Sequence, residues 1–133
     1  MELTQIRLLV SDFPSVYRFY RDTLGLKPQF EAETGPYAKL TPDTGHAAIA
    51  LQARTHLADV LERLEAAPAG HRALIALRVD DLDATHAELT SRGAEFLRDP
   101  SPMGDRMRVA YLADPEGNLI ELQEWLELRD RGQ

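Results

Sequence analysis

The sequence predicts an α+β fold built from two βαβββ modules. The first observation is an internal repeat, because a strand followed by a helix begins at Ile6 and again at Ile75, an offset of 69 residues. The second is that a glycine, Gly25 or Gly93, stands where each helix should end. Since an internal repeat is a stronger clue to topology than any single strand, we expect both modules to share one core. The predicted domain and its two halves are residues 1–133, about 3–53 and about 73–126.

The first half has a helix start signal directly after its first strand. Asp12 or Ser11 can cap the helix, and Pro14 suits its first turn. Apolar residues then recur at helical spacing as far as Leu24, and turn-rich segments divide the rest into short strands. The predicted elements are the strand Leu3–Val10, the helix Pro14–Leu24, and the strands Lys27–Glu33, Tyr37–Leu40 and His46–Ala53.

A connector helix is predicted at His56–Ala66, where the apolar residues fall on one face. The second half repeats the pattern of the first. Two prolines and a glycine predict an irregular surface loop at Asp99–Asp105, and the polar tail Glu127–Gln133 is expected to fray. The remaining predicted elements are the strand Ala73–Val79, the helix Leu82–Arg92, and the strands Glu95–Arg98, Arg106–Ala113 and Leu119–Leu126.

Alternate residues of a strand face opposite sides of a sheet, so each predicted strand has a core side and a second side. The core side is predicted to hold Ile6, Leu8, Val10, Ile49, Leu51, Ile75, Leu77, Val79, Ile120 and Leu122. The second side combines small residues, amides, a few charges and a tryptophan, which suits a concave pocket or a subunit interface. The predicted cavity residues are Gln5, Arg7, Leu9, Ala48, Ala50, Gln52, Leu74, Arg78, Leu119, Glu121, Gln123 and Trp125.

Composition excludes several classes of function. The formal net charge is −7 and no run of lysine or arginine occurs, so we expect no nucleic-acid partner. No apolar run approaches the length of a membrane helix, so we expect no membrane partner and a cytoplasmic location. The chain has no cysteine, which removes disulfides and thiolate ligands. An acidic surface could favour a cationic ligand, but it more often serves solubility.

Two segments carry a resemblance to a known family. They are Val10–Leu26, with Val-Ser-Asp at its start and Phe-Tyr-Arg-Asp-Thr-Leu-Gly-Leu at its end, and Asp114–Leu122, which reads Asp-Pro-Glu-Gly-Asn-Leu-Ile-Glu-Leu. The chain resembles the glyoxalase/bleomycin resistance/extradiol dioxygenase superfamily, also called vicinal oxygen chelate, from about Gln5 to Glu124. The resemblance implies a cupped mixed β-sheet with helices on its outer face, and a homodimer. It does not choose among lyases, isomerases, dioxygenases, thiol transferases and antibiotic binders.

The resemblance also implies a divalent metal held at four strand positions, which in this chain are Gln5, Ala50, Leu74 and Glu121. Alanine and leucine carry no ligand atom, and glutamine supplies only a weak carbonyl oxygen. One carboxylate and one amide are too few for a tight site, so we expect no metal and no other cofactor.

The histidines do not replace the missing ligands. His46 is predicted to be a polar residue at a strand end, and His56 and His71 are predicted to be solvated. His86 falls on the apolar side of the second helix, where a partly buried, hydrogen-bonded histidine is expected.

Glu121 is the candidate catalytic residue, with two interpretations. In a dry pocket without a partner, burial would raise its pKa and make it an acid or base. Alternatively, Arg7 or Arg78 faces it and forms an ion pair. We favour the pair, because an isolated buried carboxylate is costly.

The leading functional hypothesis is a metal-free protein that encloses a small molecule, an antibiotic or a metabolite, in the cup. The alternative is a lyase or dioxygenase with an atypical site for Ni²⁺, Zn²⁺, Mn²⁺ or Fe²⁺, using Glu121 with His46 or Gln5 recruited. A third hypothesis is a non-enzymatic dimer whose cup is filled by its own side chains, with Leu9, Leu74 and Leu119 as the filling.

Overall fold

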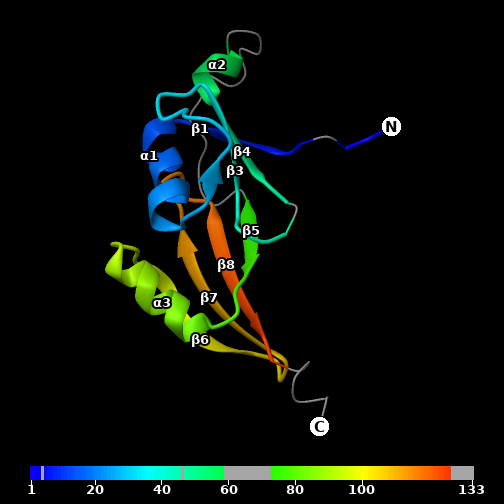
Figure 1. Ribbon diagram of the computed structural model, residues 1–133, viewed down its shortest axis with the longest axis vertical. Helices are drawn as coiled ribbons and strands as arrows, with labels where there is room; N and C mark the ends of the chain where they lie inside the picture. The colour runs from blue at the N-terminus through cyan, green and yellow to red at the C-terminus, as the bar shows by residue number, and fades with distance from the viewer. Residues whose placement is uncertain (4, 46, 59–72, 127–133) are drawn as a thin grey trace. The chain divides into compact units, whose positions relative to one another are not determined.

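The computed structural model describes residues 1–3, 5–45, 47–58 and 73–126, and the chain divides into two compact units, Met1–Ala69 and Gly70–Gln133. Each unit contains one four-stranded sheet, with a helix on one side of it (Figure 1). None of the described helices is long and apolar enough to cross a membrane.

The first unit has the strand and helix order expected of a βαβββ module. Its sheet runs in the order β1-β4-β3-β2, with β1 parallel to β4 and the other pairs antiparallel. The elements are β1 (Arg7–Val10), α1 (Phe13–Arg18), the π-helix η1 (Phe19–Thr23), β2 (Lys27–Pro28), β3 (Tyr37–Thr41), β4 (Ile49–Ala53) and α2 (Arg54–Ala58).

The helix α1 begins where the sequence predicts. The Asp12 carboxylate accepts a hydrogen bond from the Ser15 amide at 3.2 Å, and Pro14 lies in the first turn. The helix continues as η1, in which the Leu24 amide donates to the Phe19 carbonyl at 3.0 Å, so its last turn is wider than the α-helix expected. One side of the helix packs on the sheet. This core holds Val10, Phe13, Val16, Tyr17, Tyr20, Ala38, Leu40 and Leu51.

The second unit repeats the topology of the first, which confirms the α+β class and the paired βαβββ modules. Its sheet runs in the order β5-β8-β7-β6, and β5 is again parallel to its neighbour β8. The elements are β5 (Leu74–Arg78), α3 (Leu82–Ser91), β6 (Phe96–Met103), β7 (Met107–Ala113) and β8 (Leu119–Trp125). The core holds Leu82, Leu89, Ala110, Leu112, Ile120 and Leu122.

The start of α3 is held by two carboxylates. Asp81 caps it by accepting from the Ala84 amide at 3.1 Å, and Glu124 of β8 accepts from the Leu82 amide at 2.8 Å. Arg108 of β7 bonds Asp83 at 3.0 Å. The helix is thereby fixed to the side of the sheet that the core residues share.

The turn between β7 and β8 is organised by a buried carboxylate. Asp114 is 4% exposed and accepts from the Glu116 amide at 2.8 Å, the Asn118 amide at 2.8 Å and the Asn118 side chain at 3.0 Å. Gly117 has a φ of 94°, which other residues rarely adopt. These contacts explain the Asp-Pro-Glu-Gly-Asn segment as a structural turn rather than a chemical site.

Three predicted strands of the first unit are too long. The ladder starts at the pair Arg7–Ala50, so the strand predicted from Leu3 begins at Arg7, and Ile6 is 70% exposed rather than in the core. The strand predicted at His46–Ala53 begins at Ile49. The strand predicted at Lys27–Glu33 ends at Pro28.

The irregular loop predicted at Asp99–Asp105 is wrong, because most of this segment is strand. β6 continues through Pro100 and Pro102 to Met103, with register shifts against β7 between Phe96 and Ser101. Because β6 is the edge strand of its sheet, the proline nitrogens can face away from the ladder. The connector helix predicted at His56–Ala66 begins earlier, at Arg54, and its part beyond Ala58 lies outside the described residues, as does the tail Glu127–Gln133.

Candidate functional site

The candidate site of the first unit is the side of its sheet that α1 does not cover. Cross-strand partners share a side, so Arg7, Ala50 and Lys39 form one row across β1, β4 and β3, here named the Ala50 row. In the same way, Leu9, Gln52 and Tyr37 form the next row.

A chain of hydrogen bonds runs across this face. The Arg7 Nε donates to Gln5 Oε1 at 2.6 Å, and the Gln5 amide donates to the Tyr37 hydroxyl at 2.5 Å. Arg7 Nη1 also donates to Gln52 Oε1 at 3.1 Å, and the guanidinium lies 5.6 Å from the centre of the Tyr37 ring. The nearly buried Gln52 amide lies 3.0 Å from Nδ1 of His56 on α2. These bonds fix the side chains of Gln5 and Gln52.

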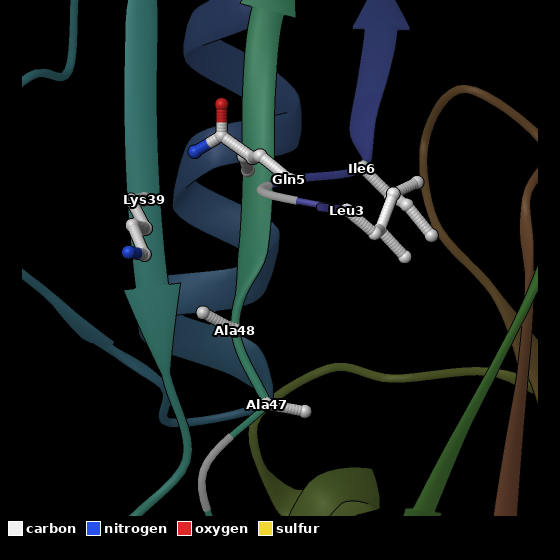
Figure 2. Close-up of a pocket in the computed structure, with 7 residues that line it drawn as sticks. Leu3, Gln5, Ile6, Lys39, Ala47 and Ala48 are labelled. Atoms are coloured by element: carbon white, nitrogen blue, oxygen red, sulfur yellow. The ribbon is translucent and has the colours of Figure 1, made fainter. Parts of the chain in front are cut away.

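A hollow of about 310 Å³ lies beside this network. Its lining is Leu3, Gln5, Ile6, Lys39, Ala47, Ala48 and Ala50. Figure 2 shows the Lys39 amine on β3 at one side of the view and the Leu3 and Ile6 side chains at the other. The hollow is therefore lined by apolar side chains on one side, by the Lys39 amine on another, and by alanines between them.

The candidate site of the second unit is the side of its sheet opposite α3. Ala76, Glu121 and Tyr111 form the row that corresponds to the Ala50 row, so Glu121 takes the place of Ala50. The Tyr111 hydroxyl donates to Glu121 Oε2 at 2.5 Å, and the Gln123 amide donates to Oε1 at 2.7 Å. The hydrogen bond to the Glu121 carboxylate, together with burial, raises the pKa of Tyr111. The phenol is therefore a donor at neutral pH.

Trp125 continues this face beyond the Glu121 row. Its indole Nε1 donates to Gln123 Oε1 at 3.2 Å, and the Arg78 guanidinium lies 5.4 Å from the ring centre. The ion pair predicted between Arg78 and Glu121 is wrong, because Arg78 lies over the indole and Glu121 is held by Tyr111 and Gln123. The other predicted partner, Arg7, is bonded to glutamines of the first unit.

The structure places the predicted cavity residues in two sets, one in each unit. Gln5, Arg7, Leu9, Ala48, Ala50 and Gln52 belong to the first unit, and Leu74, Arg78, Leu119, Glu121, Gln123 and Trp125 to the second. Within each unit, residues that were predicted to lie on the same side of the sheet are cross-strand partners, as in the pairs Arg7–Ala50 and Leu74–Leu119. That the two sets line one cup stays a prediction.

Three polar residues of these faces, Lys39, Tyr111 and Tyr37, were not among the predicted cavity residues. All three lie on the third strand of a module, and the period of two along that strand was the signal that could have found them.

The histidines agree with the prediction where the structure describes them. His86 is half-buried, lies 3.1 Å from Asp99 Oδ1 and packs against Phe96 with ring centres 4.4 Å apart. His56 is exposed, although its bond to Gln52 was not foreseen. His46 and His71 lie outside the described residues.

Comparison with known proteins identifies the family. A family model, described as the glyoxalase/bleomycin resistance protein/dioxygenase superfamily, matches residues 2–122. The chain belongs to this superfamily. It is 33% identical over 130 residues to the uncharacterized protein YraH of Bacillus subtilis (strain 168), covering 95% of this chain and 100% of YraH. The resemblance predicted from the two sequence segments is thereby confirmed.

Solved structures share the fold of this chain. A glyoxalase/bleomycin resistance protein/dioxygenase from Nocardioides matches with a TM-score of 0.75 at 21% identity, covering 96% of this chain and 87% of that one. TnmS3, an antibiotic binding protein from Streptomyces sp. CB03234, matches with a TM-score of 0.67 at 23% identity, covering 94% and 98%.

The side chains at the four positions where the resemblance implies a metal do not fit a divalent cation. Ala50 and Leu74 have no donor atom, and the Gln5 oxygen already accepts from Arg7. Both carboxylate oxygens of Glu121 accept hydrogen bonds, from Tyr111 and Gln123. No group of three or more histidine, aspartate or glutamate side chains that could hold a metal occurs in the described part of the chain. The donor set favours hydrogen bonding over coordination.

Proposed function

We propose that this chain binds a small organic molecule and requires no metal ion. The molecule binds on the sheet faces that α1 and α3 do not cover, here named the helix-free faces. The observation that carries the proposal is the hollow of about 310 Å³ over Ala50, a size at the lower end of ligand pockets. An apolar margin and fixed amides are what such pockets use to bind and orient a ligand. The proposed ligand is an antibiotic or a metabolite.

The family supports a binding role. The fold that this chain shares with TnmS3 serves, in that protein, to bind an antibiotic. The resemblance also supports a homodimer, and the composition supports a cytoplasmic location; both are proposals for this chain. Catalysis through Glu121 has less support, because the carboxylate is held by Tyr111 and Gln123.

The test begins with metal. Protein purified without chelator or an affinity metal column is measured for Ni, Zn, Mn and Fe, and each ion is then titrated into it calorimetrically. We expect far less than one ion per chain and no binding at tens of micromolar. Near-stoichiometric metal that is lost in Glu121→Ala but not in a distant surface variant, Glu88→Ala, would overturn the proposal in favour of a metal enzyme.

The second arm is a thermal-shift screen of antibiotics and metabolites in the presence of EDTA. A compound that raises the melting temperature in EDTA, confirmed by calorimetry, supports a metal-free binding protein. Compounds that bind only after a divalent ion is added would contradict it.

A further inference from the structure

The helix-free face of the first sheet has a charge opposite to that of the whole chain. Arg7, Lys39 and Lys27 lie on it, as the pairings with Ala50 and Thr41 show. The described strand residues on this face include no aspartate or glutamate, although the chain carries a formal net charge of −7. The local potential at this face therefore favours an anion, even though the surface as a whole repels one.

The Ala50 row concentrates this charge. Neighbouring strands are about 4.8 Å apart, so the backbones of Arg7 and Lys39 stand about 10 Å apart with Ala50 between them. The alanine methyl places no polar atom at the middle of the row. The corresponding row of the second unit has a carboxylate, Glu121, at this central position.

Arg7 and Lys39 both keep N–H groups that can donate a hydrogen bond to a ligand. Arg7 uses Nε and Nη1 for Gln5 and Gln52, and its Nη2 group makes no hydrogen bond to a described residue. The Lys39 amine forms no ion pair or hydrogen bond with any residue that the structure describes, and Lys39 lines the hollow. An arginine held in place by two amides and an available lysine are a suitable pair for an oxyanion.

We propose that the hollow over Ala50 takes the anionic oxygen group of a small organic acid, with Lys39 and Arg7 as its donors. The apolar body of that acid lies against Leu3 and Ile6, which are 78% and 70% exposed without it. This inference rests on the proposed function and names its ligand class: an organic anion rather than a cation. The same two positive charges oppose the approach of a metal ion or an ammonium group.

Two fluorescent probes with the same aromatic body test the charge preference. One is 8-anilinonaphthalene-1-sulfonate, an anion, and the other is N-phenyl-1-naphthylamine, which is neutral. The whole chain is titrated with each probe in EDTA at low salt. We expect the sulfonate to bind about tenfold more tightly or better, and we expect this advantage to shrink as salt screens the charges.

Variants assign the preference to the Ala50 row. Lys39→Met should weaken binding of the sulfonate about fivefold or more while leaving the neutral probe unchanged, because it removes the charge and keeps the alkyl chain. Lys39→Arg should retain the preference. Lys27→Met is the matched control, since Lys27 shares the face but does not line the hollow, and it should change binding less than twofold.

The outcomes separate this inference from the proposed function. Equal binding of the two probes, or a Lys39→Met variant that keeps the full preference, overturns the anion site while leaving a small-molecule binding protein. Failure of both probes to bind also overturns the anion site, and the unbiased screen in EDTA then decides the proposed function. Circular dichroism of each variant excludes unfolding as the cause of a lost signal.

Discussion

At the scale of single residues, Gly35 lies against a buried aromatic ring of the core. Its φ is +78°, and a Cβ built there would lie 3.0 Å from Cδ1 of the buried Phe13 ring. Gly45 has a φ of +86° but no heavy atom within 4 Å of such a Cβ. The two glycines therefore share a backbone requirement and differ in the space around them.

We predict that Gly35→Ala lowers the free energy of unfolding by about 1–3 kcal/mol, since it adds a steric contact with Phe13 to the cost of a positive φ. Gly45→Ala should cost about 1 kcal/mol, the backbone term alone. Urea denaturation of both variants measures the difference. Equal losses would show that the Phe13 ring moves aside at no cost.

Tyr111 supplies a prediction about pH. Its pKa is raised by the hydrogen bond to Glu121 and by burial, so the native state holds the phenol proton more firmly than the unfolded chain does. The stability from this interaction is present below the unfolded tyrosine pKa of about 10 and is lost as pH rises through the folded value.

The absorbance of tyrosinate near 295 nm is measured as a function of pH in the native protein and in Tyr111→Phe. The difference between the two curves is the titration of Tyr111 alone. We expect its midpoint above the usual value of about 10 and a lower midpoint in Glu121→Gln, which keeps a hydrogen-bond acceptor but removes the charge. An unchanged midpoint in Glu121→Gln would contradict the assigned cause.

At the scale of elements, the β7–β8 turn depends on Asp114. We predict that Asp114→Ala lowers the free energy of unfolding by about 2–4 kcal/mol, because it leaves the amides of Glu116 and Asn118 without their acceptor. Asp99→Ala is a control that removes an exposed carboxylate paired with His86 and should cost less than about 1 kcal/mol. Chemical denaturation measures the free energy of unfolding of both variants. Similar losses of stability in the two variants would contradict the role assigned to Asp114.

Element type was predictable wherever a local signal agreed with packing. Asp12 caps its helix as expected, and the core side of β8, with Ile120 and Leu122, is the buried one. The ends of the strands were less predictable, because hydrogen bonding to the neighbouring strand, rather than the hydropathy of each residue, determines where a strand ends. Ile6 is apolar but precedes the first paired residue, Arg7.

At the scale of the whole molecule, the repeat made the fold recognisable from sequence alone. The two sheets have the same strand order, and the position of Ala50 in one corresponds to Glu121 in the other. That the residues at the implied metal positions, Ala50 and Leu74 among them, carry few donor atoms was readable from residue types. The hydrogen bonds of Arg7 and Tyr111 were not, since they depend on cross-strand neighbours that the sequence does not pair by itself.

The oligomeric state is a further prediction at this scale. The superfamily resemblance implies a homodimer, so light scattering coupled to size exclusion should give a mass of about 30 kDa, twice the 14.9 kDa of the chain. Dilution over two orders of magnitude should leave that mass unchanged if the dimer is obligate. A mass of one chain at all concentrations would exclude the dimer.

The prolines of β6 have a consequence for self-association. A sheet grows when a new strand finds a continuous row of amide hydrogens along an exposed edge, and this is how many fibrils elongate. Pro100 and Pro102 have no amide hydrogen, and the register shifts of β6 bend the edge further from a template. Polymers that extend the second sheet from this side are therefore disfavoured. The opposite edge strand of this sheet, β5, has no proline at Leu74–Arg78, so this protection belongs to β6 alone within the second sheet.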